Sequence, residues 1–261
     1  FTFTDNKGIG KASDIPAELL EEAQAMRASM VEDIAEADED LMNKYLEEGE
    51  LSDEELKTGL RKGVISGGII PLICGSSLKG IGVTMLMDLV VTSFASPEDR
   101  GSVTGHKPGT DEIEERKPSE DEAFSAIVFK TIADPYAGRL TLFRVYSGKL
   151  NSDSAVYNAT RKVTEKFGHI FYLEGKSQKQ AETLVPGDIA GVAKLKETVT
   201  GDTLANEKVP IIFEKVPVPP PIMSFAVEPK SRGDEDKIAS SINRLMEEDP
   251  TIVFSRNTQT R

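Results

Sequence analysis

Apolar residues recur every three or four positions along residues 19–45, and acidic side chains fill most of the positions between them. This spacing places the apolar side chains on one stripe and predicts an amphipathic helix with a solvated acidic face. Asp14 can cap this helix, with Pro16 in its first turn. A second helix is predicted after Ser52, because Glu55 three residues later completes a capping box.

An apolar run at residues 69–74 predicts a buried strand. It leads into Gly75-Ser76-Ser77, and residues 83–91 then repeat apolar side chains at helical spacing. A strand, a tight polar loop and a helix in this order are typical of a βα unit in an open α/β sheet, where ligands bind at the carboxyl ends of the strands. Taken alone, Gly75-Ser76-Ser77 is more often an ordinary connector.

Residues 98–122 are rich in Gly, Pro and charged side chains and are predicted to form a linker or long loop. From residue 123 to residue 213 the hydrophobic period changes to two, and Gly-bearing turns separate short β-rich segments. Closely spaced short strands of this kind predict a small antiparallel barrel. The predicted strands are residues 123–132, 139–146, 154–157, 162–171, 188–192 and 203–204. The aromatic residues of this region are interpreted as core rather than as a base-stacking platform: Phe124, Phe129, Phe143, Tyr146 and Tyr157.

A proline-rich joint at residues 216–221 is followed by a predicted strand at 222–227, an amphipathic helix at 234–246 and a second strand at 251–254. Two strands under one helix are marginal alone, so we expect them to open a further domain. The predicted organisation is an α/β domain end with a helical insert (1–98), a linker (99–122), a β-barrel (123–215) and the start of a third domain (216–261).

Apolar residues make up 38% of the 261 residues, and none of the apolar runs approaches the roughly 20 residues that a membrane span requires. The single cysteine, Cys74, cannot form an internal disulfide, which fits a reducing compartment. The first residues lack the basic and apolar regions of a secretory signal and the initiating Met. We therefore expect a chain that begins inside a longer one, in the cytoplasm.

The net charge of −13 is uneven along the chain. Residues 1–60 hold five basic and 17 acidic side chains, whereas residues 130–208 hold 12 basic and nine acidic ones. A surface for a polyanion is therefore expected on the predicted barrel rather than at the acidic N-terminus.

Metal and nucleophile motifs are scarce. His106 and His169 lie far apart in the sequence, and the chain has no HExxH, CxxC or GxSxG pattern, so a zinc site or a hydrolase triad is not predicted. His106 is expected to be solvated in the linker and His169 to be structural. Two fragments imitate a P-loop without its strand-to-helix context, Gly175-Lys176-Ser177 and Gly8-Ile9-Gly10-Lys11, and are interpreted as chance.

Several segments resemble, in order, the translational GTPase elongation factor G and its paralogues. The segment Gly75-Ser76-Ser77-Leu78-Lys79 resembles that family's last guanine-recognition loop, and the acidic helices before it resemble the insert of its GTPase domain. The end of the chain, around Glu247-Glu248-Asp249-Pro250-Thr251, resembles the opening of the third domain. The most specific match, to the opening of the second domain, is Ala133-Asp134-Pro135-Tyr136-Ala137-Gly138-Arg139-Leu140-Thr141, and the closing strands of that domain are matched by Leu195-Lys196-Glu197-Thr198-Val199-Thr200-Gly201-Asp202-Thr203-Leu204.

The resemblance implies the end of a P-loop GTPase domain, a translation-factor β-barrel and the start of a ferredoxin-like α+β domain. It also implies GTP or GDP with Mg²⁺ as cofactors of the intact protein, and a guanine-loop remnant at Ser76, Ser77 and Leu78. Ser77 departs from the family's Ala, and residues 167–170 depart from the typical factor, which suggests a paralogue. The P-loop, switch segments and Asn-Lys-x-Asp motif are absent from this chain, so we expect it neither to bind nucleotide nor to hydrolyse GTP.

The resemblance further implies a ribosomal partner, with the barrel contacting small-subunit ribosomal RNA by shape and phosphate. No membrane or DNA partner is expected, and the chain is expected to be a monomer. Two alternatives stay open: a barrel module that binds ribosomal RNA without nucleotide, and another translational GTPase such as a ribosomal protection protein or a release factor paralogue. The candidate phosphate contacts are Arg139, Arg144, Lys149, Arg161 and Lys162.

Overall fold

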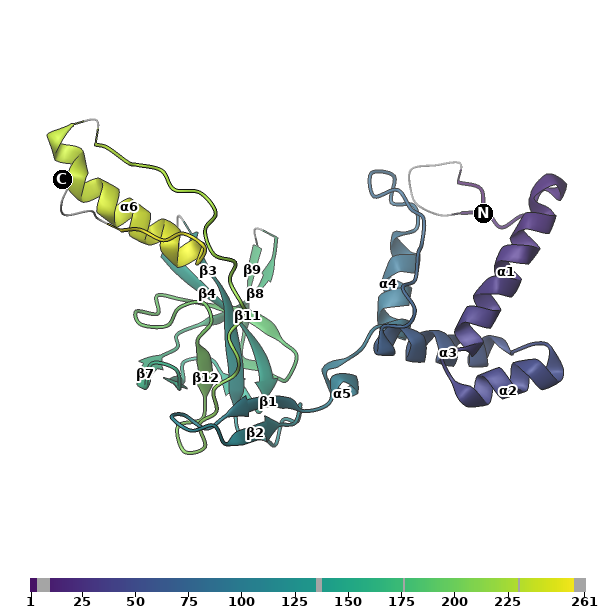
Figure 1. The fold of residues 1–261 in the computed structure, drawn as a ribbon, viewed down its shortest axis with the longest axis horizontal. Coiled ribbons are helices and arrows are strands. Elements are labelled where there is room, and N and C mark those ends of the chain that lie inside the picture. The colour runs from purple at the N-terminus through teal and green to yellow at the C-terminus, as the bar shows by residue number, and fades with distance from the viewer. Residues whose placement is uncertain (4–9, 135–137, 176, 230, 256–261) are drawn as a thin grey trace. The chain divides into compact units, whose positions relative to one another are not determined.

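The computed structural model describes residues 1–3, 10–134, 138–175, 177–229 and 231–255. The chain forms two compact units, Phe1–Asp99 and Arg100–Arg261, and Figure 1 labels most of their helices and strands. The turn at Pro135-Tyr136-Ala137, the P-loop-like positions Gly8, Ile9 and Lys176, and Lys230 lie outside the described residues.

The first unit is helical. The α1 and α3 helices pack together and bury Ile34, Ala35 and Leu56. A methyl group at Gly59 of α3 would lie 2.7 Å from the Ile34 side chain and 2.8 Å from that of Leu41, so the absence of a side chain permits this close packing. The elements of this unit are a 3-10 turn (Ala17–Leu19), α1 (Leu20–Ala35), α2 (Glu39–Glu48), α3 (Asp53–Ser66), α4 (Val83–Ser93) and the short α5 (Pro97–Arg100) at its boundary.

The prediction of one helix across residues 19–45 is wrong, because the chain turns between α1 and α2. Asp38 caps α2 by accepting a hydrogen bond from the backbone N–H of Leu41 at 3.1 Å. Asp14 is not a cap, because the N-cap position of the first turn is occupied by Pro16 and no side chain makes a capping bond there. The capping box before α3 is confirmed, with Ser52 and Glu55 each accepting the other's backbone N–H.

The strand predicted at residues 69–74 does not form, although the segment is extended. A strand needs a neighbour to accept its backbone hydrogen bonds, and the described part of this unit pairs no strand with this segment. Ile70, Leu72 and Ile73 are accordingly exposed, Leu72 to 92%, whereas Ile69 is half-buried. The helix predicted after it is confirmed as α4.

The second unit is built on an antiparallel eight-stranded sheet of order β7-β6-β12-β3-β4-β11-β8-β9. The predicted strands are found in this sheet, except that the one at 162–171 divides into β7 and β8, and β5, β9 and β10 form in segments where no strand was predicted. The strands of this unit are β1 (Val103–His106), β2 (Ile113–Arg116), β3 (Ser125–Asp134), β4 (Gly138–Ser147), β5 (Leu150–Asn151), β6 (Ala155–Asn158), β7 (Val163–Lys166), β8 (Ile170–Glu174), β9 (Ser177–Ala181), β10 (Thr183–Leu184), β11 (Ile189–Ala193) and β12 (Thr203–Ala205).

The sheet curls so that its two ends approach each other. The β10 strand continues from the edge strand β9 and pairs with β5, which leads into β6 beside the opposite edge strand β7. Side chains facing the inside form one apolar core, in which Phe143 and Phe167 meet edge to face with ring centroids 5.7 Å apart. This curled sheet fits the predicted translation-factor barrel.

A second apolar cluster covers the outer face of the sheet. It joins Ile127 of β3 to Ile211 and Phe213 beyond β12, and Tyr146 packs on it with its ring 4.9 Å from that of Phe213. Of the five aromatic residues interpreted as core, Phe129 is the exception, since it lies at a β-bulge and is exposed.

Residues 99–122, predicted as a linker, instead hold the β1–β2 hairpin. His106, predicted to be solvated, lies in β1 and is half-buried, and its backbone exchanges two hydrogen bonds of 2.9 Å with Ile212. Arg116 at the end of β2 is buried and donates to the carbonyl oxygen of Val209 at 2.9 Å. The hairpin thus ties the segment before the barrel to the segment after it. The sequence did not reveal this hairpin, because its two strands have four residues each and lie in a segment rich in charged side chains.

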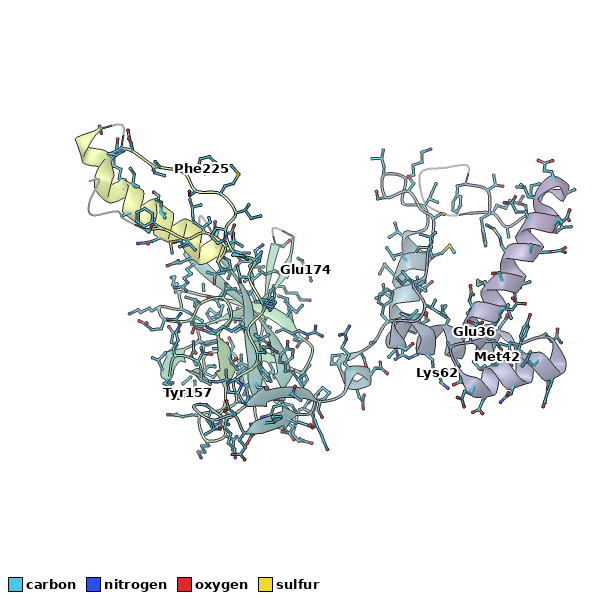
Figure 2. All side chains as sticks on the ribbon, in the orientation of Figure 1. Glu36, Met42, Lys62, Tyr157, Glu174 and Phe225 are labelled. Carbon is cyan, nitrogen blue, oxygen red and sulfur yellow. The ribbon has the colours of Figure 1, made fainter. Side chains whose placement is uncertain are left out.

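After the barrel the chain is extended as far as a 3-10 turn (Arg232–Asp234) and α6 (Glu235–Glu248), which packs near β3. The strands predicted at 222–227 and 251–254 do not form, and Ile222 is 96% exposed. Phe225, labelled in Figure 2, is also exposed on this segment. Among the described residues, none of the helices has the length and apolar character needed to cross a bilayer.

Candidate nucleic-acid interface

Arg161 and Lys162 lie together in the turn that joins β6 to β7. The Oδ1 atom of Asn158, a buried residue at the end of β6, accepts the backbone N–H of Arg161 at 3.0 Å. Lys162 has a φ of 58°, in the left-handed region that residues other than glycine rarely adopt. Thr160 accepts the backbone N–H of Thr203 at 2.9 Å, so this turn is fixed to the neighbouring strand β12.

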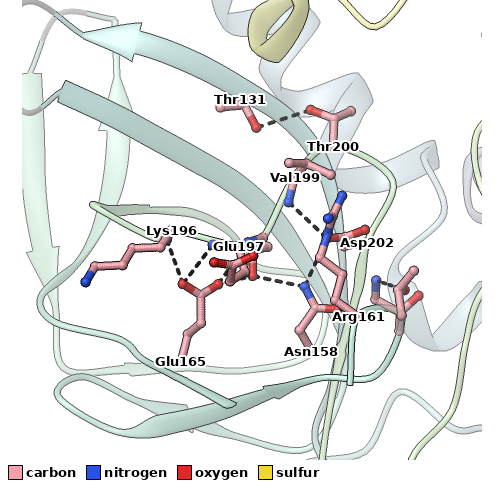
Figure 3. A network of polar contacts seen from close by, with 12 residues as sticks. Thr131, Asn158, Arg161, Glu165, Lys196, Glu197, Val199, Thr200 and Asp202 are labelled. Carbon is pink, nitrogen blue, oxygen red and sulfur yellow. Dashed lines mark hydrogen bonds and ion pairs between the residues drawn. The ribbon is translucent and has the colours of Figure 1, made fainter. Parts of the chain in front are cut away.

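Asp202 is the centre of the polar network drawn in Figure 3, and its side chain is 1% exposed. One carboxylate oxygen, Oδ2, accepts hydrogen bonds from Arg161 Nε at 2.7 Å, Asn158 Nδ2 at 3.0 Å and the backbone N–H of Val199 at 2.9 Å. The turn that places it depends on Gly201, whose φ is 88°. A buried carboxylate is thereby paired with a guanidinium whose side chain is 41% exposed.

Glu165 on β7 holds the loop between β11 and β12. Its carboxylate accepts the consecutive backbone N–H groups of Lys196 at 2.6 Å, Glu197 at 3.2 Å and Thr198 at 2.9 Å, and also the Thr198 hydroxyl (Figure 3). Successive N–H groups of this kind form an anion-binding concavity. Burial raises the pKa of Glu165, but these hydrogen bonds outweigh it, so the pKa lies below its ordinary value.

Arg139 holds the same loop from its carbonyl side. Its guanidinium donates to the carbonyl oxygen of Lys196 at 3.1 Å and to that of Thr198, and its Nε lies 3.9 Å from the Glu247 carboxylate on α6. The side chain is only 17% exposed. The Arg139 guanidinium is therefore occupied by contacts within the protein, although the sequence made Arg139 a candidate phosphate contact.

The other two candidates lie on separate parts of the barrel. Lys149 forms an ion pair of 2.7 Å with Glu120, which raises the Lys149 pKa. Arg144 is half-buried on β4, paired in register with Ile127 and Ile189. Arg161 and Lys162 thus share the β6–β7 turn. Arg144 lies on β4 and Lys149 lies between β4 and β5, so neither belongs to that turn.

The predicted guanine-loop remnant lies after the extended segment at residues 69–74. Ser76 and Ile81 exchange backbone hydrogen bonds of 2.9 and 3.0 Å, which close a tight loop before α4. Ser77 and Leu78 are exposed at its tip. The described residues include no group of three or more His, Cys, Asp or Glu side chains placed to bind a metal ion.

Sequence reasoning missed Asn158, Glu165 and Asp202. Hydrophobic periodicity cannot reveal a buried polar group, because it assigns polar side chains to the solvent face. One signal was available for Asp202, since it follows Gly201 in a turn where an Asp side chain can bond to nearby backbone N–H groups.

Comparison with known proteins places these residues in a family. The sequence model of elongation factor G domain 2 matches residues 123–207, and that of elongation factor G domain III matches residues 218–261. These two stretches of the chain therefore match two domains of elongation factor G. A crystal structure of a protein from Thermus thermophilus is similar over 97% of this chain, with a TM-score of 0.78 and 28% sequence identity. The chain spans 36% of that protein's length.

The elongation factor G domain 2 match includes all five candidate phosphate contacts and the network around Asp202. The domain III match includes α6, so the ion pair between Arg139 and Glu247 joins the two matched domains. The resemblance seen in the sequence is confirmed for these parts of elongation factor G.

Proposed function

We propose that this chain is part of a translation elongation factor whose barrel docks on small-subunit ribosomal RNA. In the intact protein this docking would support the coupling of GTP hydrolysis to movement of tRNA and mRNA. The observation that carries the proposal is the β6–β7 turn, in which buried polar groups fix Arg161 to the barrel and Lys162 follows it directly. Phosphate contacts of this kind position a protein on RNA without reading its sequence.

The remaining parts are proposed to serve the same factor. Residues 1–98 would complete a P-loop GTPase domain, with Ser76, Ser77 and Leu78 at the guanine and with GTP or GDP and Mg²⁺ bound by the intact protein. Residues 216–261 would open a ferredoxin-like domain. The factor would act in the cytoplasm as a monomer. We expect no GTP hydrolysis by this chain, because its sequence contains no P-loop to hold the phosphates.

Co-sedimentation with purified small ribosomal subunits tests the docking. We expect the chain to pellet with the subunits, and the double variant Arg161→Gln/Lys162→Gln to do so at least about tenfold more weakly. The control is Lys179→Gln/Lys208→Gln, which removes the same charge from two exposed positions elsewhere on the barrel. Absence of binding by the unmodified chain, or equal losses in the two double variants, would contradict the proposal.

A further inference from the structure

Arg161 is held by two hydrogen bonds of its own and by a third that fixes the turn around it. Its backbone N–H donates to Asn158, its Nε donates to Asp202, and the turn that contains it is bonded to β12 through Thr160. These contacts use one of the five N–H groups of the guanidinium. The side chain is therefore fixed at Nε, although 41% of its surface is exposed to solvent.

We infer that Asp202 and Asn158 are positioning residues that orient Arg161 as a ready fork for a phosphate of an RNA backbone. This inference rests on the proposed docking function. Neither residue would touch the RNA. Lys162, which follows in the same turn, would supply a second positive charge to the same stretch of backbone.

The chemistry of the pair favours this role over simple stabilisation of the turn. An asparagine side chain at position 202 could still accept the N–H of Val199 and close the turn, and it would avoid the cost of burying a charge. What a carboxylate adds is a negative charge, which strengthens the bond that Oδ2 accepts from the cationic Arg161 Nε more than the bond from the neutral Asn158 amide. Its other oxygen, Oδ1, is buried and has no hydrogen-bond partner among the described residues, so the charge is committed to the side of Arg161.

Pre-orientation matters because a free arginine loses rotamer freedom when it binds. A planar guanidinium that is already fixed can present its terminal N–H groups to two oxygens of one phosphate with less loss. Lysine cannot replace it, since an ammonium is a point charge without the fork and has no Nε to bond Asp202. Arg161 is thus predicted to contribute more to the affinity for RNA than a positive charge alone would.

The test measures binding of the full chain to small ribosomal subunits over a series of salt concentrations. We expect Arg161→Lys to lose about as much affinity as Arg161→Gln, roughly tenfold, although it keeps the charge. Lys179→Arg is the matched control, because it also exchanges one cation for another at an exposed position of β9 outside the proposed contact, and it should bind like the unmodified chain. A result in which Arg161→Lys binds normally would overturn the inference while leaving the docking function intact.

Asp202→Asn tests the positioning residue itself. We expect it to weaken binding and to lower the slope of log affinity against log salt by about one phosphate contact, and Arg161→Gln should then add no further loss. A fall in thermal stability with an unchanged salt slope would show a merely structural role and overturn the inference. Should Asp202→Asn not fold, the comparison of Arg161→Lys with Arg161→Gln decides. If the unmodified chain does not bind, the proposed function itself fails.

Discussion

The carboxylate of Glu165 accepts hydrogen bonds from both the backbone N–H and the side-chain hydroxyl of Thr198. These two residues belong to β7 and to the loop before β12, which have no ladder between them. Together with the N–H groups of Lys196 and Glu197, they make one side chain the anchor of an entire loop. Glu165 therefore binds the N–H side of this loop, while Arg139 binds two of its carbonyl oxygens.

Replacing Glu165 with Gln should destabilise the second unit by about 1–2 kcal/mol, because an amide oxygen is a weaker acceptor and its NH₂ group opposes backbone donors. Chemical denaturation followed by circular dichroism measures the change. Glu174→Gln is the control, since Glu174 is exposed at the end of β8. Equal stabilities of the two variants would contradict the importance of the anchor.

The same carboxylate should make stability depend on pH. The pKa of Glu165 is lower in the folded chain than its ordinary value of 4.5, so the folded state favours the ionised form. Its contribution is complete above about pH 4.5 and is lost as the pH falls through the lower folded value. Denaturation at a series of pH values should show a smaller acid-induced loss in Glu165→Gln than in the unmodified chain. An identical pH profile for both would contradict this assignment.

The first unit offers an independent test at the start of α3. Ser52→Ala removes the side chain that accepts the Glu55 N–H and should destabilise this unit by about 1 kcal/mol. The variant should also raise the pKa of Glu55, which a hydrogen bond from Lys44, followed by bonds from Ser52, lowers to about 2. Ser29→Ala in the exposed middle of α1 is the control. Carboxyl chemical shifts recorded over pH would report the titration.

Two glycines with similar backbone angles separate strain from steric clash. Gly148 has a φ of 69°, and a Cβ there would lie 2.5 Å from the backbone nitrogen of Phe124. Gly175 has a φ of 62° and nothing within 4 Å of its Cβ position. Gly175→Ala should cost about 1 kcal/mol for strain, whereas Gly148→Ala should cost at least about 3 kcal/mol or prevent folding. Comparable melting temperatures for the two variants would refute the clash.

Much of the barrel could be predicted from its sequence, because each of its main strands carries its own alternation and its own turn residues. Strand β9 could not, since Ser177, Gln178 and Lys179 show no apolar alternation and are paired only because β8 offers them hydrogen bonds. The reverse failure occurred at residues 69–74 and 222–227, where an apolar pattern was present but the described part of the chain offers no neighbouring strand. Pairing is a property of two segments, and a pattern describes only one.

The candidate site shows the same limit at the level of side chains. Arg161 and Arg139 are equally plausible phosphate contacts in the sequence, since each is a cation beside a turn. The difference between them arises from carboxylate and carbonyl partners about 40 to 60 residues away, at Asp202 for one and at Lys196 and Thr198 for the other. Contacts over such separations are fixed by topology, which the local pattern does not encode.

The hydrogen bonds between His106 and Ile212 have a mechanical consequence. They fasten the strand that arrives at the barrel to the strand that departs from it, with Arg116 and Val209 adding a third bond nearby. A force that pulls the two ends of the barrel segment apart would act first on these hydrogen bonds. The barrel strands would bear the force only after these bonds had broken. The regions before residue 106 and after residue 212 can therefore transmit force to each other without deforming the barrel.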